Sequence, residues 1–110
     1  MSNQFNKTLN TNIGTAETAV YSTGATTRAT VIGINIANTT TNTVYVDIKL
    51  RDETSTSGYI VKGAEIPARS ALAAMGGDQK LVMEPLNYLL INSDTAASID
   101  VIVSVLEIIS

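Results

Sequence analysis

Hydrophobic and polar residues alternate with a period of two over several short segments of this chain. In Val44–Arg51, the clearest case, Val44, Val46, Ile48 and Leu50 occupy one face and polar residues occupy the other. Successive side chains of a strand point to opposite faces of its sheet. The pattern therefore predicts an antiparallel strand with one buried face and one face in water.

Further segments have the same character and are separated by polar or glycine-containing turns. The predicted strands are Ala19–Ser22, Arg28–Asn38, Gly58–Lys62, Ser70–Met75, Gln79–Glu84, Asn87–Asn92 and Ala97–Ile109. Ser70–Met75 also has a helical composition, so one helical turn is the alternative there. Short polar loops on either side of Val44–Arg51 predict that it forms a hairpin with the strand before it and another with the strand after it.

Two predicted strands have unusual faces. In Arg28–Asn38, alternation places Thr30, Ile32, Ile34 and Ile36 on one face and the smaller Ala29, Val31, Gly33, Asn35 and Ala37 on the other. The strand Ala97–Ile109 is apolar on both faces, with Ile99, Val101, Val103, Val105 and Ile109 on one and Ile102, Leu106 and Ile108 on the other. Two-sided apolar strands occur where both faces are covered. A partner subunit or the loops of the same domain would supply the second cover.

The first fifteen residues are rich in Asn and Thr, with Phe5, Leu9 and Ile13 at four-residue spacing. A helix could use that spacing, but Asn and Thr between these positions are poor helix formers. We predict an extended N-terminal arm over residues 1–15, ordered on docking or free in solution, and one domain over residues 16–110. The expected fold is all-β, an antiparallel β-sandwich of jelly-roll or immunoglobulin-like type.

Composition points to a surface that another protein can cover. Charged residues make up 15% of the chain, against about 25% in an average soluble domain. A weakly charged surface is cheaper to desolvate in an assembly. A Thr-rich sandwich surface without a partner would have the same composition. The net charge of −3 and the scattered basic residues argue against nucleic-acid binding. No secretory signal or membrane-spanning run is evident, so no membrane partner is expected.

The residue inventory excludes several kinds of catalytic and metal site. The chain contains neither His nor Cys, so Ser-His-Asp and Cys-His nucleophiles and thiolate metal sites are impossible. Asp52 and Glu53 could offer oxygens to Ca²⁺, but adjacent acids at a strand end are usually solvated. The Gly76–Lys80 segment lacks the spacing of a phosphate loop and predicts a tight turn. We therefore predict no catalytic, cofactor-binding or metal site and no enzymatic activity.

From Ala19 onward the chain resembles small structural proteins of tailed bacteriophages, many of them cyanobacterial phages. The matching segments are Ala29–Thr40, Tyr59–Pro67, Gly76–Pro85 (Gly-Gly-Asp-Gln-Lys-Leu-Val-Met-Glu-Pro) and Ile99–Ile108. These residues shape a fold and carry no chemistry. The resemblance implies a β-sandwich virion protein assembled in the host cytoplasm. Its implied role is that of a capsid cement or decoration protein, a homotrimer bound to the major capsid protein.

Two other functions compete with the cement role. A neck, tail or adaptor component of the virion would have the same sequence character. A carbohydrate- or receptor-binding module is less favoured, because aromatic residues are only 5% of the chain and Trp is absent. Such binding surfaces usually need aromatic platforms.

Overall fold

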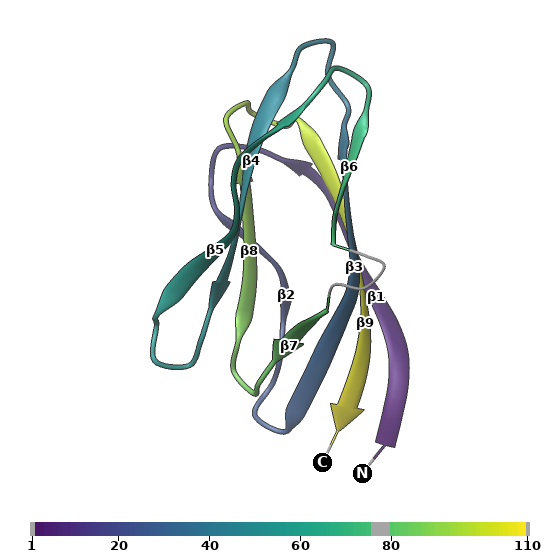
Figure 1. Cartoon of the computed structure of the whole chain (residues 1–110), viewed down its shortest axis with the longest axis vertical. Helices are drawn as coiled ribbons and strands as arrows, with labels where there is room; N and C mark the ends of the chain where they lie inside the picture. The colour runs from purple at the N-terminus through teal and green to yellow at the C-terminus, as the bar shows by residue number, and fades with distance from the viewer. Residues whose placement is uncertain (1, 76–79, 110) are drawn as a thin grey trace.

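The computed structural model describes residues 2–75 and 80–109, and within these residues it contains strands and no helix (Figure 1). The strands are β1 (Ser2–Ile13), β2 (Thr18–Ser22), β3 (Thr27–Asn38), β4 (Val44–Arg51), β5 (Ser57–Ile66), β6 (Ala71–Met75), β7 (Leu81–Met83), β8 (Tyr88–Ser93) and β9 (Ile99–Ile109). The predicted all-β sandwich is confirmed. Within the same residues, no helix is long and apolar enough to cross a membrane.

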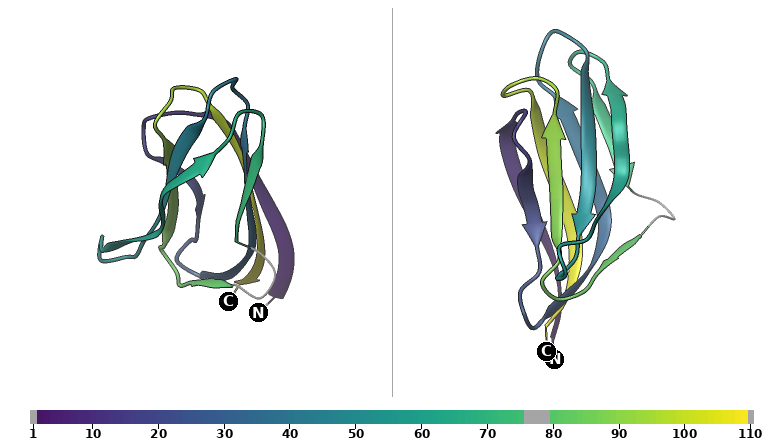
Figure 2. Two further views of the ribbon diagram at one scale, coloured as in Figure 1. Left: turned by 45° about the horizontal axis from the view of Figure 1, so that its top comes forward. Right: turned by 90° about the vertical axis from the view of Figure 1, so that its left-hand side faces the viewer.

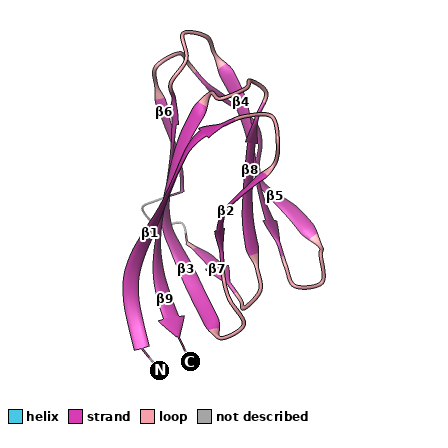
Figure 3. Cartoon of the chain, turned by 180° about the vertical axis from the view of Figure 1, so that it is seen from behind, coloured by secondary structure: helices cyan, strands magenta, loops and turns pink. Residues whose placement is uncertain are grey.

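The strands form two antiparallel sheets that pack face to face (Figure 2). The first sheet has the order β1-β9-β3-β6, and β7 pairs with another part of β3. The second has the order β2-β8-β4-β5. In the first sheet β9 lies between β1 and β3 and is hydrogen-bonded along both edges. Figure 3 shows these three strands side by side.

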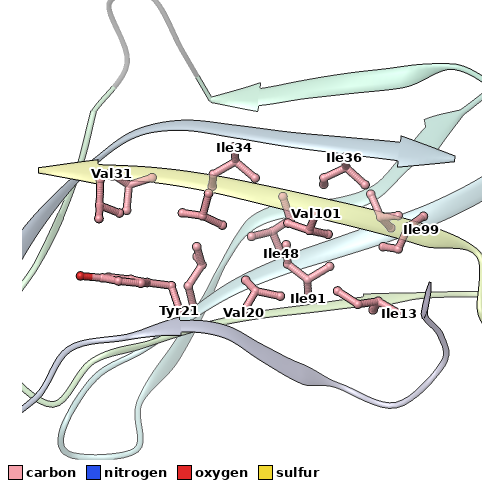
Figure 4. Close-up of a cluster of buried hydrophobic side chains, with 14 of the residues drawn as sticks. Ile13, Val20, Tyr21, Val31, Ile34, Ile36, Ile48, Ile91, Ile99 and Val101 are labelled. Carbon is pink, nitrogen blue, oxygen red and sulfur yellow. The ribbon is translucent and has the colours of Figure 1, made fainter. Parts of the chain in front are cut away.

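The core lies between the two sheets and consists mainly of β-branched side chains (Figure 4). Ile34, Ile36 and Val101 from the first sheet meet Ile48 and Ile91 from the second, and all five are essentially inaccessible to solvent. Burying one such side chain contributes about 1.5–3 kcal/mol. Branched side chains also suit the pleated surface of a strand, because few rotamers are lost there. The same alternation that predicts the strands therefore supplies the core.

A β-bulge in β3 corrects the predicted faces of that strand. Pairing with β9 shifts register between Val31 and Gly33, which adds one residue and reverses the alternation beyond it. Val31 is buried before the bulge and Ile34 is buried after it, although uniform alternation placed them on opposite faces. Ile32 lies at the bulge and is only half-buried.

The predicted hairpin between Arg28–Asn38 and Val44–Arg51 is wrong. Strand β3 belongs to the first sheet and β4 to the second, so the connecting loop crosses the sandwich. Buried Asn38 holds this crossing: its Nδ2 donates to the carbonyl oxygens of Asn42, Ile66 and Pro67, and its Oδ1 accepts from Thr40. The second predicted hairpin, between β4 and β5, is confirmed.

Strand β5 is longer than predicted. It runs past Gly63, which the sequence had suggested as a break, because Gly63 adopts a positive φ of 66° at an irregularity in the pairing with β4. The main-chain N–H of Gly63 donates to Asp47 at 2.7 Å. Ser70–Met75 forms the strand β6 and not a helical turn. Most of the predicted turn at Gly76–Lys80 lies outside the described residues.

The described part of the predicted arm is extended, and it lies in the sheet. Strand β1 pairs with β9 from Ser2↔Ile109 to Asn10↔Val101 without a shift. The register then shifts, Asn12 adopts a φ of 55°, and Ile13 turns into the core. Gly14 follows at once and starts the crossing to the second sheet.

Replacing Asn38 by Ala should lower the free energy of unfolding by at least about 2 kcal/mol, because buried carbonyl groups lose their donor. Asn35→Ala, an exposed change in the same strand, should cost less than about 0.5 kcal/mol. Urea unfolding of both variants measures the difference. Equal losses would show that the Asn38 bonds do not hold the crossing.

Replacing Gly14 by Ala should destabilise the fold by about 1–3 kcal/mol through overpacking. A Cβ at Gly14 would lie 2.9 Å from the main-chain nitrogen of Ala97 and 3.1 Å from the Cα of Ala96. Gly24→Ala is the matched control, since a Cβ there meets nothing within 4 Å. Thermal unfolding should show a lower midpoint for Gly14→Ala alone; equal midpoints for the two variants would contradict the crowding.

Candidate interaction face

The outer face of the first sheet carries a group of exposed and half-buried apolar side chains that the core does not use. We call it the apolar face and define it by Phe5 and Leu9 on β1, Ile102 and Leu106 on β9, and Ile32 on β3. Phe5 is 77% exposed, Leu9 61% and Ile102 41%. Contiguous apolar surface of this kind marks sites of association in soluble proteins.

Pairing between β1 and β9 arranges four of these side chains in two rows. Phe5 lies opposite Leu106, and Leu9 lies opposite Ile102. Lys7 lies opposite Ser104 between the two rows. A shallow hollow of about 410 Å³ adjoins the first row and is lined by Phe5, Asn6, Lys7, Ile32, Ser104 and Val105.

Strand β1 has the reverse of the usual polarity for a sheet that packs on a core. Its inward side chains are polar: Thr8 Oγ1 and Asn10 Nδ2 donate to the carbonyl oxygen of Val20 at 2.8 and 3.2 Å. Its large apolar residues Phe5 and Leu9 point outward instead. Among its side chains from residue 3 to residue 13, only Ile13 is buried. Phe5 and Leu9 therefore contribute little to this chain's own core, to which β1 supplies Ile13.

Glu107 closes the end of the sandwich beneath the apolar face. Its carboxylate accepts hydrogen bonds from Tyr21 Oη at 2.6 Å, Gln4 Nε2 at 3.2 Å and Asn6 Nδ2 at 3.3 Å. The Tyr21 bond, and then those from Gln4 and Asn6, lower the pKa of Glu107 against the opposing effect of desolvation. Burial, together with the Glu107 bond and charge, raises the pKa of Tyr21. This network links β1 and β9 to β2 across the core.

The outer face of the second sheet has the opposite character. Lys49 pairs with Glu17, which raises the pKa of Lys49, and Lys62 lies 3.7 Å from Asp47. The ammonium group of Lys62 also sits 4.6 Å from the ring centre of Tyr59. Paired charges of this kind are stable in water and costly to desolvate. The sandwich therefore has one face suited to solvent and one suited to a protein partner.

Asp52, one of the two acids considered as Ca²⁺ ligands, has a local structural role. Asp52 Oδ1 accepts from Thr54 N, Thr54 Oγ1 and Thr56 N at 2.9, 2.7 and 3.0 Å, and it thereby caps its own turn. These bonds, first that from the Thr54 hydroxyl, lower the pKa of Asp52. Within residues 2–75 and 80–109, no group of three acidic side chains is placed to hold a metal ion.

Sequence reasoning found two of the five residues of the apolar face. The two-sided apolar pattern of the last strand predicted that Ile102 and Leu106 lie on its second face, and they do. Phe5 and Leu9 were assigned to an arm and were missed as members of this face. The signal was present, because an even spacing of four places two residues on the same side of a strand.

Neither a protein-family model nor a curated protein matches the chain. Among the solved structures that match the chain, two with TM-scores above 0.5 share its fold. A chain from Bacillus endospore appendages, described as disulfide-linked pili, has 13% identity and a TM-score of 0.57, with 98% of this chain and 88% of that chain covered. A chain from a viral particle of infectious bursal disease virus has 8% identity and a TM-score of 0.57. The match covers 96% of this chain but 30% of the viral chain.

These likenesses concern the fold. Both matched chains come from structures described as assemblies, a pilus and an icosahedral virus particle. The all-β sandwich of this chain is thus a fold that also occurs in subunits of such assemblies.

Acid should destabilise the fold partly through Glu107. A carboxylate whose pKa is lowered by folding stabilises the folded state above its ordinary pKa, and that contribution is lost as the pH falls through the folded pKa. Glu107→Gln and Tyr21→Phe should each lose less stability than the wild type between neutral and acidic pH. Urea midpoints across this pH range measure the effect. Parallel curves for all three proteins would show that Glu107 is not coupled to folding.

Proposed function

We propose that this chain is a non-enzymatic structural protein of a bacteriophage particle. Within the particle, we propose the role of a capsid cement or decoration protein, which stabilises the shell by bridging major capsid protein subunits. It would assemble in the host cytoplasm and function in the virion. The observation that carries the proposal is the asymmetry of the sandwich, with an apolar outer face on one sheet and paired charges on the other.

The physical demands of a cement protein agree with this structure. Such a protein needs a rigid core, a surface that is cheap to desolvate and a second surface that remains in water. The interlocked β-branched core meets the first demand. The apolar face is the surface that is cheap to desolvate. The outer face of the second sheet, with Lys49, Tyr59 and Lys62, is the surface that remains in water, and we call it the charged face.

The shared fold with a virus-particle chain and a pilus chain supports a role in assembly. This chain contains no cysteine, so it cannot form the disulfide links described for that pilus. We propose that copies associate as homotrimers on the shell. A position in the neck, the tail or an adaptor ring is the alternative placement in the particle.

Copy number in the particle separates these placements. A cement protein should be present at a large fraction of the major capsid protein's abundance, whereas a neck or tail component forms a single ring or stack. Quantitative mass spectrometry of purified particles measures the ratio. A ratio near that of one ring would contradict the cement role and favour the alternative, and absence from the particle would overturn the virion proposal.

We also propose that residues 1–15 act in docking and that residues 16–110 form the domain. Deleting residues 1–12 removes Phe5 and Leu9 and nearly all of β1 but keeps the buried Ile13. The truncated protein should still fold, with lower stability and less β-sheet circular dichroism because β9 loses its pairing with β1, and should occupy the shell less than the full chain. Unchanged occupancy in a particle-binding assay would contradict a docking role for this segment.

A further inference from the structure

We infer that the apolar face is the contact between copies of this chain, with Phe5 as its anchor. The inference deepens the structural function proposed above by naming the surface through which copies associate, and it rests on that function. The occupant of the face is a second copy of the same chain.

The first argument is the reversed polarity of β1. An isolated sandwich would gain stability by pointing Phe5 and Leu9 into its core, yet the register with β9 points polar Thr8 and Asn10 inward. Phe5 remains 77% exposed and Leu9 61% exposed. Large aromatic side chains exposed beside a hollow are typical anchors of protein interfaces.

The second argument is the spacing of the two apolar rows. The Phe5–Leu106 row and the Leu9–Ile102 row lie on either side of the Lys7–Ser104 pair, about 13 Å apart at the rise of a strand. A second copy with parallel strands would place each row at the height of the same row of its neighbour. Copies arranged around any rotation axis along the strands, a two-fold or a three-fold axis, have this relation. Antiparallel strands would place each row on the other row. The face is therefore self-complementary along the strand direction.

The third argument is size. The strand positions of β1, β9, β3 and the short strands beside it, at ~4.8 Å spacing and ~36 Å length, give the whole outer face of the first sheet a size of roughly 700 Å². Specific interfaces bury about 600–1,000 Å² from each partner. The outer face of the first sheet, with the apolar face in it, is thus within the size range of a stable contact with one other copy.

Lys7 lies between the two rows, so in both arrangements it comes near the Lys7 of the other copy. Its position on the edge strand lets its long side chain reach solvent beside the interface, which reduces the repulsion. Asp100 Oδ1 accepts from the main-chain N–H of Asn12 at 3.0 Å. Arg28 and Glu84 form a 2.8 Å ion pair near the end of the sheet, away from the Leu9–Ile102 row.

The test compares the full-length chain with Phe5→Lys and Leu9→Lys, alone and combined, by sedimentation velocity over a wide range of concentration. Both positions are exposed in the single chain, so the variants should fold, which circular dichroism checks. Wild-type protein should self-associate. Phe5→Lys should weaken association about thirtyfold, the effect expected for loss of an aromatic anchor.

Tyr59→Lys, on the outer face of the second sheet, is the matched control. It should associate like the wild type. A wild-type monomer at all concentrations, or a combined variant that associates as strongly as the wild type, would overturn the inference.

Cross-linking of introduced cysteines gives a second readout. The natural chain contains no cysteine, so every thiol cross-link involves a residue that was introduced. Leu9→Cys treated with a short bismaleimide should give covalent pairs in the parallel arrangement. A mixture of Phe5→Cys and Leu9→Cys should give mixed pairs in the antiparallel one. Tyr59→Cys should give few covalent pairs under the same conditions. Cross-linking of Tyr59→Cys at the level of the other variants would contradict the assigned surface.

The two proposals fail separately. If the chain self-associates through the apolar face but is absent from phage particles, the proposed function fails and the self-contact stands. If the wild type binds particles, and the variant with both Phe5→Lys and Leu9→Lys binds them too and keeps the wild-type oligomeric state, the self-contact fails and the proposed function stands.

Discussion

Hydrogen bonding of β9 along both of its edges is the constraint on which the rest of the structure depends. With β1 on one side and β3 on the other, the strand cannot rotate or slip, because a shift by one residue would reverse all its side chains. Val101, Val103 and Val105 are thereby fixed in the core. Ile102 and Leu106 are fixed on the outside by the same pairing, so a buried core and an apolar outer face are two results of one register.

The neighbours of β9 reinforce this division. On one side, the bulge in β3 lets Val31 and Ile34 both face the core despite their odd spacing. On the other side, β1 supplies a polar inner surface and an apolar outer one. Glu107 joins this edge to the second sheet through Tyr21. The outer face of the second sheet carries the Lys49–Glu17 and Lys62–Asp47 ion pairs, so it is more strongly charged than the apolar face.

The sequence was sufficient for features that depend on local alternation. Val44–Arg51 is a strand with the predicted bounds, and the two-sided character of the last strand is real. Features that depend on an irregularity were missed. The bulge at Ile32 and the turn at Asn12 each reverse alternation through one residue, and neither has a strong local signal. The crossing at Asn38 was missed as well, because its bonds join segments that are far apart in the chain.

Function was harder to predict than fold, because a surface shows its purpose only when its residues are placed together. Phe5 and Ile102 are nearly a hundred positions apart in the sequence and contribute to neighbouring rows of one face. Absence of His and Cys limits catalytic chemistry but names no partner. The placement of apolar residues outside a complete core is the structural observation that points to association.

The central claim is that protein covers the apolar face in the assembled state, and hydroxyl-radical footprinting tests it most directly. Free chain at low concentration and assembled particles would be oxidised under the same conditions and compared by mass spectrometry. The account predicts strong protection of Phe5, Leu9 and Ile102 on assembly, while Tyr59 on the charged face stays reactive. Equal oxidation of Phe5 in both states, or protection of Tyr59 in its place, would contradict the account.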